Sequence, residues 1–416
     1  MGMRRGQILG LVGSLALLGC DDPGAAGPID APSADASDPD AGASPDASAG
    51  PDAAIPTVEP LPPLRFDPAF SDDGSLLLGS GHPGALSSWG TRLELCAVAV
   101  ENTIERPVFD VLYTFRTTPG ASEDVFATAP LSEPTICTAG ALHADGSSVS
   151  AFLQASGTTQ LVRRGVDGVM GPPGTPPQAG EVRALVAFDG GRVVAVFDDA
   201  VWLLDAALAP IATFGVNGRL AVPGTLRFAV RPQLAGARLD VVTTTAVLRV
   251  DIDTGALDPS FGNGGVAALP TDWTYGAVPL LDGGLLLVGV GTGRQVSPTG
   301  AVRAVTLPPV SPTLSIADGE GGAYLFELAD LQATEMTVTR IAPSGPDAWG
   351  TGGSQVLTPP LGCAVHPGPL CSHEWFQLRG ATWTSTGRLA LLLENRGGFA
   401  TDVFHTRAPQ LVVLAR

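Results

Sequence analysis

Short apolar runs alternate with glycine-containing turns through the last two thirds of the chain. Runs that end in a tight-turn pair introduce a second apolar run at ICTAGALHADG (136–146), RALVAFDGG (183–191), YGAVPLLDGG (275–284) and LSIADGEGG (314–322). Asp-Gly and Gly-Gly supply the positive φ angles that two-residue hairpin turns require. The pattern therefore predicts a series of antiparallel β-hairpins.

The hairpins recur at a fixed interval. Turn glycines Gly146, Gly190, Gly236 and Gly283 are 44, 46 and 47 positions apart. A third apolar run follows each hairpin, and then a phrase with its own short strand, as in PIATFGVNGRLAVP (210–223), LDPSFGNGGVAALP (257–270) and PDAWGTGGSQVLTP (346–359). Four strands in one such interval make one blade of a β-propeller.

Divided at this interval, the chain predicts an all-β, seven-bladed β-propeller, with six or eight blades as alternatives. The expected blades are 92–135, 136–180, 181–224, 225–273, 274–312, 313–373 and 374–416. The last one ends where a copy of the phrase is due, and a copy occurs instead at FDPAFSDDGSLLL (66–78). We therefore expect strand 66–78 to join the C-terminal blade, so that residues 61–416 form one closed domain with no open sheet edge.

The repeated phrase is a turn signal. Asp258-Pro259 favours a type I turn, and the glycine pair Gly262 and Gly265 turns the chain into the next strand. Aromatic residues at this position, Phe214, Phe261 and Trp349, are expected to pack inside or between blades. A phosphate-binding loop would need a following helix and usually a lysine. All 23 basic residues are Arg, which disfavours that interpretation.

The phrase LDPSFGNGGVAAL resembles the delta-60 repeat, a β-propeller unit with the consensus Leu-Asp-x-Ser-Phe-Gly-x-Gly-Gly before a strand. The match is strong at 257–265, fair at 66–74, 213–218 and 348–353, and weak at 164–168. The resemblance implies a propeller without an assigned activity and carries no catalytic residues to this chain.

The N-terminus has the layout of an export signal. Arg4 and Arg5 precede an apolar run, ILGLVGSLALL (8–18), that is too short to span a bilayer. It ends in Leu-Leu-Gly-Cys (17–20), which resembles the bacterial lipobox. The resemblance implies that residues 1–19 are a lipoprotein signal peptide and that Cys20 becomes the acylated first residue. We expect a protein of the cell envelope, anchored by lipid to the outer or inner membrane with its domain outside the cytoplasm.

Residues 20–60 contain many Asp, Ala and Pro residues and almost no bulky side chains. Such a segment cannot bury enough apolar surface to order itself, so it predicts a disordered tether. Its composition is similar to that of tethers in myxobacterial lipoproteins. With 41 acidic residues the net charge is −18, which disfavours binding to nucleic acid or to anionic lipid.

Four cysteines remain besides Cys20. We expect a disulfide between Cys96 and Cys137, placed in the first strands of adjacent blades, with two buried free thiols as the alternative. Cys363 and Cys371 flank an insertion that a second disulfide would close. Cys363, His366, Cys371 and His373 could instead bind zinc, but disulfide formation in an exported protein would consume both thiols. Asp251 and Asp253 hint at a calcium loop and are interpreted as turn formers.

Ligand binding is expected on the face where one blade connects to the next. Three of these connections are long: 79–91, 171–181 and 358–374. An aromatic-rimmed pocket could form from residues in or beside them: Trp89, Trp273, Tyr275 and Trp375, with His82, His366 and His373 nearby. The sequence thus predicts a monomeric binding or scaffolding module, without a cofactor or metal, for a protein, peptide, glycan or cell-wall partner. The alternative is an enzyme, a metal-dependent lactonase or a glycan-cleaving propeller, with its site in the central funnel.

Overall fold

The computed structural model describes residues 62–67, 75–77, 81–89, 92–99, 111–116, 124–127, 135–154, 156–230, 237–270, 276–330, 333–342, 345–346, 353–359, 371–384, 387–399 and 405–415. The chain divides into two units, Met1–Thr57 and Val58–Arg416, and all described residues belong to the second. The expected signal peptide, Cys20 and the whole tether lie outside the described residues.

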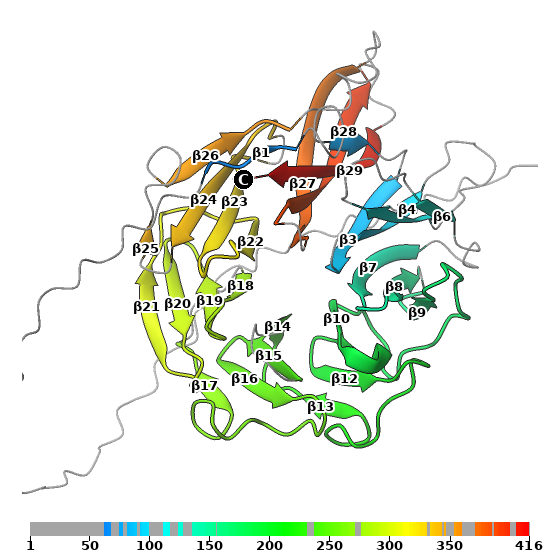
Figure 1. Ribbon diagram of the computed structural model, residues 1–416, viewed down its shortest axis with the longest axis vertical. Coiled ribbons are helices and arrows are strands. Elements are labelled where there is room, and N and C mark those ends of the chain that lie inside the picture. Colours follow the sequence, from blue (N-terminus) through cyan, green and yellow to red (C-terminus); the bar gives the residue numbers. More distant parts are fainter. Residues whose placement is uncertain are drawn as a thin grey trace, which may run out of the picture. The chain divides into compact units, whose positions relative to one another are not determined.

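The described strands form seven antiparallel sheets (Figure 1). The first contains β3 (Gly81–Trp89), β4 (Arg92–Ala99), β5 (Val111–Arg116) and β6 (Asp124–Ala127). The second contains β7 (Thr135–Leu142), β8 (Ser148–Gln154) and β9 (Thr159–Arg164). The third contains β10 (Ala184–Ala187), β11 (Val193–Val196), β12 (Ala200–Leu204) and β13 (Arg219–Ala221), with the 3-10 turn η1 (Asp189–Gly191) between its first two strands.

Sheets four to six follow the same order. The fourth contains β14 (Leu226–Val230), β15 (Arg238–Thr243), β16 (Ala246–Asp251) and β17 (Val266–Ala268). The fifth contains β18 (Gly276–Pro279), β19 (Leu285–Val288), β20 (Thr292–Val296) and β21 (Val302–Thr306). The sixth contains β22 (Leu314–Ala317), β23 (Ala323–Leu328), β24 (Met336–Ala342), β25 (Gly345–Pro346) and β26 (Ser354–Leu357).

The seventh sheet joins the two ends of the described chain. It contains β27 (Cys371–Trp383), β28 (Leu389–Phe399) and β29 (His405–Ala415), together with β1 (Arg65–Phe66) and β2 (Ser75–Leu77). Both N-terminal strands pair antiparallel with β29, Phe66 opposite Leu414 and Leu76 opposite Leu411. The segment that the sequence assigned to the C-terminal blade, 66–78, thus supplies strand β2 to that sheet.

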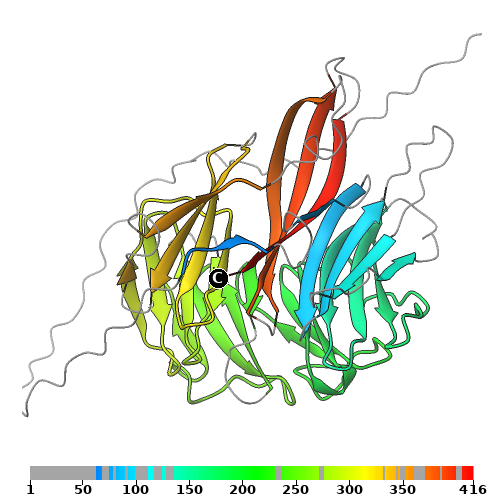
Figure 2. The ribbon, with the colours of Figure 1, turned by 45° about the horizontal axis from the view of Figure 1, so that its top comes forward.

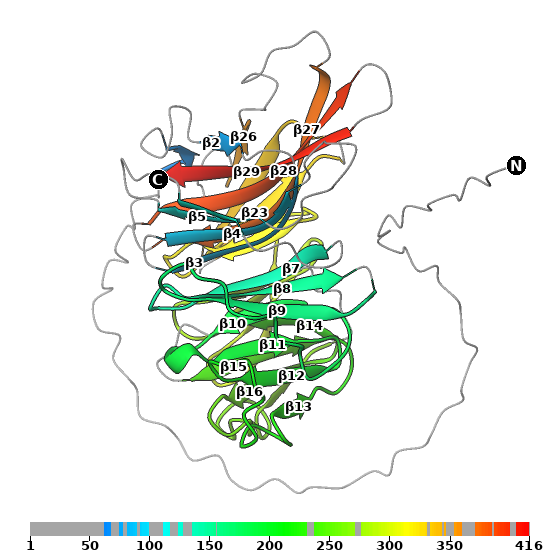
Figure 3. The same ribbon diagram turned by 90° about the vertical axis from the view of Figure 1, so that its right-hand side faces the viewer.

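The sheets stand around a central axis (Figures 1 and 3). The first strands of successive sheets lie side by side in the order β3, β7, β10, β14, β18, β22 and β27, and β27 lies beside β3 again. Within each sheet the later strands follow outward (Figure 1). The predicted fold class, an all-β propeller, is confirmed.

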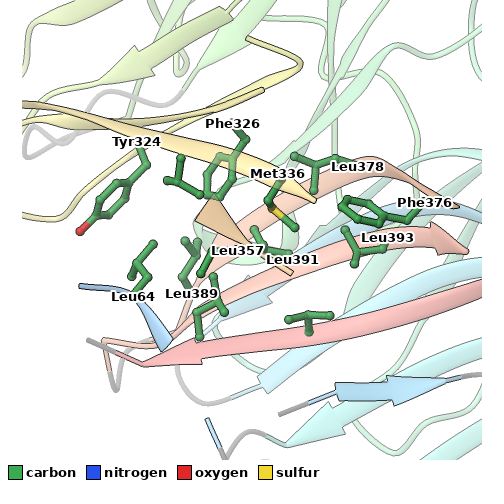
Figure 4. Packing of buried hydrophobic residues seen from close by; sticks show 13 residues of the cluster. Leu64, Tyr324, Phe326, Met336, Leu357, Phe376, Leu378, Leu389, Leu391 and Leu393 are labelled. Carbon is green, nitrogen blue, oxygen red and sulfur yellow. The ribbon is translucent and has the colours of Figure 1, made fainter. Parts of the chain in front are cut away.

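Apolar side chains fill the spaces between neighbouring sheets. Figure 4 shows the cluster between the sixth and seventh sheets, where Tyr324 and Phe326 pack with Phe376, Leu389 and Leu391. Leu64, only 1% exposed, belongs to the same cluster. The segment just before β1 is therefore part of the core that closes the ring.

The ring has two faces that differ in the turns they carry. The hairpin face carries the turns between first and second strands, at 143–147, 189–192, 280–284 and 318–322. The crossover face carries the turns between second and third strands and the connections from one sheet to the next, at 198–199, 222–225, 244–245 and 307–313. First strands run from the crossover face to the hairpin face.

Two predicted boundaries were wrong. Residues 79–91, expected as a long connection, contain β3, so the first sheet begins at Gly81 rather than at residue 92. The stretch GHPGALSSW has too little apolar character to show as a strand in the sequence, and it is held by pairing with β4 on one side. The strands of the last sheet are also longer than the apolar runs that predicted them, since β27 has 13 residues and β28 and β29 have 11 each.

Candidate functional site

The repeated phrase links one sheet to the next. The backbone N–H of Gly215 donates to the carbonyl of Thr254, and that of Gly262 donates to Thr299 (3.1 and 2.8 Å). In both cases the phrase of one sheet binds a Thr-Gly turn of the following sheet. Phe214 and Phe261 are fully buried beneath these contacts. The prediction that the aromatic residues pack is confirmed for these two, and Trp349 lies outside the described residues.

The Thr-Gly turns leave no room for a side chain. A Cβ atom on Gly300 would lie 2.3 Å from the backbone nitrogen of Gly262, and Gly300 has a φ of +86°. L-amino acids with a side chain rarely adopt that φ. The phrase and its turn therefore form a backbone clamp between sheets, and this accounts for the recurrence of the phrase.

A buried arginine reinforces the seam between the fourth and fifth sheets. Arg249 on β16 forms a bidentate pair with Asp240 on β15, with Nε–Oδ1 and Nη2–Oδ2 distances of 2.7 and 2.8 Å. It also donates to the carbonyls of Pro298 and Gly283 in the fifth sheet, at 2.7 and 2.8 Å. Its guanidinium carbon lies 4.3 Å from the ring centroid of Phe261. Arg249 thus connects the core of one sheet to the backbone of the next.

Two other buried arginines are also paired with acids, one between two sheets and one within a single sheet. Arg164 on β9 donates to Glu94 on β4 and so joins the second sheet to the first. Arg340 on β24 binds Asp318 at the end of β22, with an Nε–Oδ2 distance of 2.9 Å. The Arg164–Glu94 pair thus links two sheets, whereas the Arg340–Asp318 pair lies within the sixth sheet.

The ring closure has its own ion pair. Arg388, before β28, lies 2.7 Å from a carboxylate oxygen of Asp67. The Asp67 N–H donates to Val413, and the Gln355 side chain donates to the Leu64 carbonyl (2.9 and 2.6 Å). The N-terminal strand is thus held by both its neighbours.

Burial changes the protonation of the acidic partners. Desolvation raises the pKa of Glu94, although Arg164 and a hydrogen bond from Ser148 oppose the rise. Desolvation also raises the pKa of Asp240, against hydrogen bonding and charge from Arg249. Each carboxylate therefore depends on its arginine to stay ionised in the interior.

His143 is a buried histidine on the hairpin face. It is 3% exposed, its Nδ1 lies 3.3 Å from the carbonyl of Phe188 in the third sheet, and its Nε2 has no hydrogen-bond partner among the described atoms. Desolvation, together with the nearby charge of Arg163, lowers the pKa of His143. The imidazole is therefore neutral at physiological pH and is enclosed at the junction of two sheets.

The turn with Asp251 and Asp253, considered as a calcium loop from the sequence, is stabilised by hydrogen bonds to the Asp251 side chain. Asp251 Oδ1 accepts hydrogen bonds from the N–H and hydroxyl of Thr254, at 3.0 and 2.9 Å. Asp253 is exposed and pairs with Arg192 at 2.5 Å. Within the described part of the chain, no three His, Cys, Asp or Glu residues are grouped in a way that could hold a metal ion.

One predicted disulfide is present. Cys96 and Cys137 are bonded, with Cα atoms 6.1 Å apart, and link the first two sheets. The predicted position of Cys96 was wrong, because it lies on the second strand β4 and not on a first strand. Cys363 and His366 lie outside the described residues. Cys371 and His373 are in β27, where only their backbone is described.

The structure places two of the four residues predicted for the aromatic rim, and these two lie apart from each other. Trp89, 41% exposed, lies at the end of β3 on the hairpin face. Trp375 is half-buried near the start of β27, on the crossover side. Ser88 bonds Thr382, seven residues beyond Trp375, so the two tryptophans are about 20 Å apart along the strands. Trp273 and Tyr275 lie outside the described residues.

The crossover face has one feature that the repeat does not explain. The three long strands of the seventh sheet rise beyond their neighbours (Figure 2). We call residues 371–377, 393–399 and 405–410 of β27, β28 and β29 the arm. Phe376 and Leu393 lie in the core on one face of the arm, and the Phe376 N–H donates to Ala333 of the sixth sheet at 3.1 Å.

The backbone register of the arm brings several polar positions of its three strands opposite one another. Arg396 is opposite both Trp375 and Arg407, and Gly398 is opposite both His373 and His405. Glu394, one row nearer the ring, is buried and bonded to Arg379 at 2.7 Å. His373 and Trp375 were predicted as candidate residues from the sequence, whereas Arg396, His405 and Arg407 were not. No apolar alternation continues past Glu394 in LLLENRGGF, so no signal in the sequence marks the strand at Arg396.

Comparison with known proteins gives the fold and no closer relationship. No protein-family model and no curated protein matches the chain. Among solved structures, a chain of a mitotic checkpoint complex is similar with a TM-score of 0.53 and 14% identity, covering 88% of this chain and 96% of that one. A streptogramin B lyase structure is similar with a TM-score of 0.51 and 11% identity, covering 82% and 97% respectively.

YCF48 bound to a D1 peptide is similar with a TM-score of 0.50 and 11% identity, covering 81% of this chain and 95% of that one. At these identities the likeness establishes a β-propeller and nothing about activity. In the described residues, no helix is both long and apolar enough to cross a membrane.

Proposed function

We propose that this protein is a lipid-anchored, extracytoplasmic β-propeller that acts as a binding or scaffolding module of the cell envelope. The observation that supports binding is the arm, a sheet extension on the crossover face formed by strands of 13, 11 and 11 residues. The lipobox-like Leu-Leu-Gly-Cys at 17–20 supports the anchor. Acyl chains bound at Cys20 would hold the ring at a membrane, outer or inner, at about 0.8 kcal/mol per buried methylene.

The rigidity of the ring supports a scaffolding role. Backbone clamps, buried arginines and the Cys96–Cys137 bond connect successive sheets. A framework that is fixed in this way can present a surface without rearranging, which lowers the entropic cost of binding. We further propose that the chain is a delta-60-type propeller and acts as a monomer.

The number of blades follows from how the first two sheets are counted. We propose seven, one for each sheet. A count of six would treat the three-stranded β7–β9 sheet and its disulfide-linked neighbour as one unit. An experimental density map in which these two sheets are continuous would favour six.

Mass spectrometry of the mature N-terminus tests the anchor. We expect acylated Cys20 as the first residue, and Cys20→Ser should move the chain from the membrane fraction to the soluble fraction. An unmodified N-terminus upstream of Cys20 would contradict the anchor.

Affinity capture from envelope extracts tests the proposed binding function. We expect partners that are retained by the wild-type chain and lost by Trp375→Ala. Val216→Ala is the matched control, because Val216 is 76% exposed and lies on the phrase of the third sheet, away from the arm. Equal capture by all three proteins would refute binding through the arm.

The enzyme alternative has one observation in its favour. His143 is buried with an unpartnered Nε2, and such a neutral imidazole could act as a general base. Its enclosure between two sheets is unfavourable for substrate access. Turnover of a lactone or glycoside by the wild-type chain, lost in His143→Gln with an unchanged unfolding midpoint, would support this alternative.

A further inference from the structure

We propose that the hairpin face binds an aromatic carboxylate at the seam between the first and second sheets. The site consists of the indole of Trp89, the guanidinium of Arg92 and the turn that contains Gly146. It lies on the hairpin face, whereas the arm lies on the crossover face. The inference therefore goes beyond the binding proposed for the arm and does not depend on it.

Three rows of contacts join these two sheets along β4. In the first row, Cys96 forms the disulfide to the second sheet. In the second row, Glu94 accepts a hydrogen bond from Arg164 of β9. In the third row, Arg92 lies against the turn between β7 and β8, where a Cβ atom on Gly146 would overlap its Nη1 atom. Side chains alternate along a strand, so every second residue of β4 points toward the second sheet, and the third row is the one at the hairpin face.

Trp89 belongs to the third row. It is the cross-strand partner of Arg92 on β3, and directly opposite side chains lie on the same face of a sheet with Cβ atoms about 5 Å apart. The hydroxyl of Ser87, two positions earlier, lies 3.8 Å from the position of a Cβ atom on Gly140 of β7. This face of β3 is thus turned toward the second sheet. Because Trp89 is 41% exposed, its ring is accessible beside the guanidinium.

The acids of this seam are bonded to groups other than Arg92. Glu94 is paired with Arg164, and both are buried. Asp145 Oδ1 accepts hydrogen bonds from the N–H and hydroxyl of Ser147, at 2.8 and 2.7 Å. Within the described part of the chain, Arg92 forms no hydrogen bond or ion pair. Its guanidinium is half-buried and keeps its donors available for an anion.

The same turn in other sheets carries acids that stabilise the turn itself. Asp282 Oδ1 accepts a hydrogen bond from the Gly284 N–H, and Asp318 Oδ1 accepts one from Gly322, both at 2.8 Å. The first sheet has Trp-Gly-Thr-Arg at this position, residues 89–92. Among the described atoms, its indole and guanidinium have no partner within the turn. Stabilisation of the turn therefore does not account for these two side chains.

The two side chains fit one kind of ligand. A guanidinium binds a carboxylate through two parallel N–H···O bonds, and an indole stacks with an offset on another aromatic ring. One cation beside one ring matches a carboxylate that is a few bonds from a single aromatic ring. A phosphate group would gain more from a second cation, and Arg164 is already paired with Glu94. Two sources have the required chemistry: a free aryl-substituted acid and a peptide chain that ends in Phe or Tyr.

Binding is tested with the full-length chain in detergent micelles, by calorimetric titration with N-acetyl-phenylalanine against matched empty micelles. The amide of the same compound removes the charge, and N-acetylglycine removes the ring. We expect the acid to bind, the other two compounds to bind at least tenfold more weakly, and the affinity to fall with added salt. A hexapeptide with a C-terminal Phe distinguishes the two sources, because tighter binding than the free acid indicates a chain terminus and weaker binding indicates a small molecule.

Variants locate the site and separate binding from folding. Arg92→Gln and Trp89→Ala should each lower the affinity at least tenfold, and Arg92→Lys, which keeps the charge without the planar fork, should give an intermediate loss. Arg303→Gln is the matched control, because it removes an exposed arginine from β21 of the fifth sheet and should leave the affinity unchanged. Thermal unfolding of Arg92→Gln should match the wild type, since Arg92 has no partner among the described residues.

Four results would overturn the proposal. These are no binding of N-acetyl-phenylalanine, equal binding of its amide, an equal loss in Arg303→Gln, or a lowered unfolding temperature in Arg92→Gln, which would mean that this arginine is paired within the chain. Trp375→Ala, which tests the arm, should leave this affinity unchanged. Failure of the arm and failure of this site are therefore distinguishable.

Discussion

Replacing Arg249 with methionine tests whether the buried arginines hold the sheets together. Arg249→Met removes both bonds to Asp240 and the two donations to carbonyls of the fifth sheet. Asp240 is 0% exposed and would be left as a buried acid without its partner. Removing one member of a buried pair costs about 3–5 kcal/mol, so we expect a loss of that size in the free energy of unfolding near neutral pH.

The loss should depend on pH with a defined sign. Burial already raises the pKa of Asp240, and removal of the Arg249 charge raises it further. A carboxyl whose pKa is higher in the folded than in the unfolded state stabilises the folded protein at acidic pH. That stabilisation is lost as the pH rises through the folded-state pKa. The deficit of Arg249→Met relative to wild type should therefore be largest near neutral pH and smaller toward about pH 4, the ordinary value for aspartate.

Urea unfolding followed by far-ultraviolet circular dichroism, near neutral pH and near pH 5, measures both effects. Arg303→Gln is the control, since Arg303 is exposed and bonds only Gln295 among the described residues; it should change stability by under about 0.5 kcal/mol. Adding Asp240→Leu to Arg249→Met should recover part of the loss. A deficit below about 1 kcal/mol, or one that is equal at both pH values, would refute the role assigned to this pair.

Three further predictions concern the seams of the ring. Gly300→Ala should cost about 3 kcal/mol or more, because its Cβ would lie 2.3 Å from the Gly262 nitrogen, whereas Gly157→Ala, at a similar φ with nothing within 4 Å, should cost about 1 kcal/mol; unfolding midpoints compare the two. Replacing Cys96 and Cys137 by Ala opens a loop with a separation of 41 residues and should cost about 4 kcal/mol in urea unfolding, without further loss when reductant is added. Leu64→Ala should cost about 2–5 kcal/mol and increase protease cleavage before β3, and an unchanged cleavage rate would argue against closure by this segment.

The parts of the fold that the sequence predicted are those with a repeating physical cause. Hairpin turns need glycine at positive φ, and Gly146 and Gly283 have φ values of +88° and +83°. Core strands need continuous apolar runs, and β11 and β19 are buried at every position. These signals recur in every sheet of regular length, so the period located most of the sheet boundaries.

The prediction errors concern strands whose conformation is determined by pairing with neighbouring strands and not by their own amino-acid composition. β3 contains Gly81, Pro83 and Gly84, which disfavour a strand when taken alone. In the folded ring, β3 pairs with β4 and packs beside β7 and β27, and this tertiary context determines its conformation. The arm was missed for the same reason, since its polar outer rows carry no apolar period beyond Glu394.

The candidate site was predictable in part. His373 and Trp375 were singled out because they follow an insertion in the repeat, and they do lie together on the arm by register. Trp89 was grouped with them from its position in an expected connection, and it lies at the other end of its strand. Arg396 and Arg407 are close in the sequence. Only the pairing of β28 with β29, however, shows that they are opposite each other.

Residues that recur from sheet to sheet are those that form contacts between neighbouring sheets. A clamp needs two halves from different sheets, a phrase in one and a Thr-Gly turn in the next. The fifth sheet has no phrase but retains Thr299 and Gly300, because that turn serves the phrase of the fourth sheet. Each such contact thus constrains the phrase and the Thr-Gly turn that form it. It does not constrain other positions of the same two sheets. The seventh sheet is constrained by ring closure at β1 and β2, near the C-terminal end of β29, whereas residues 405–409 of β29 lie beyond those pairings.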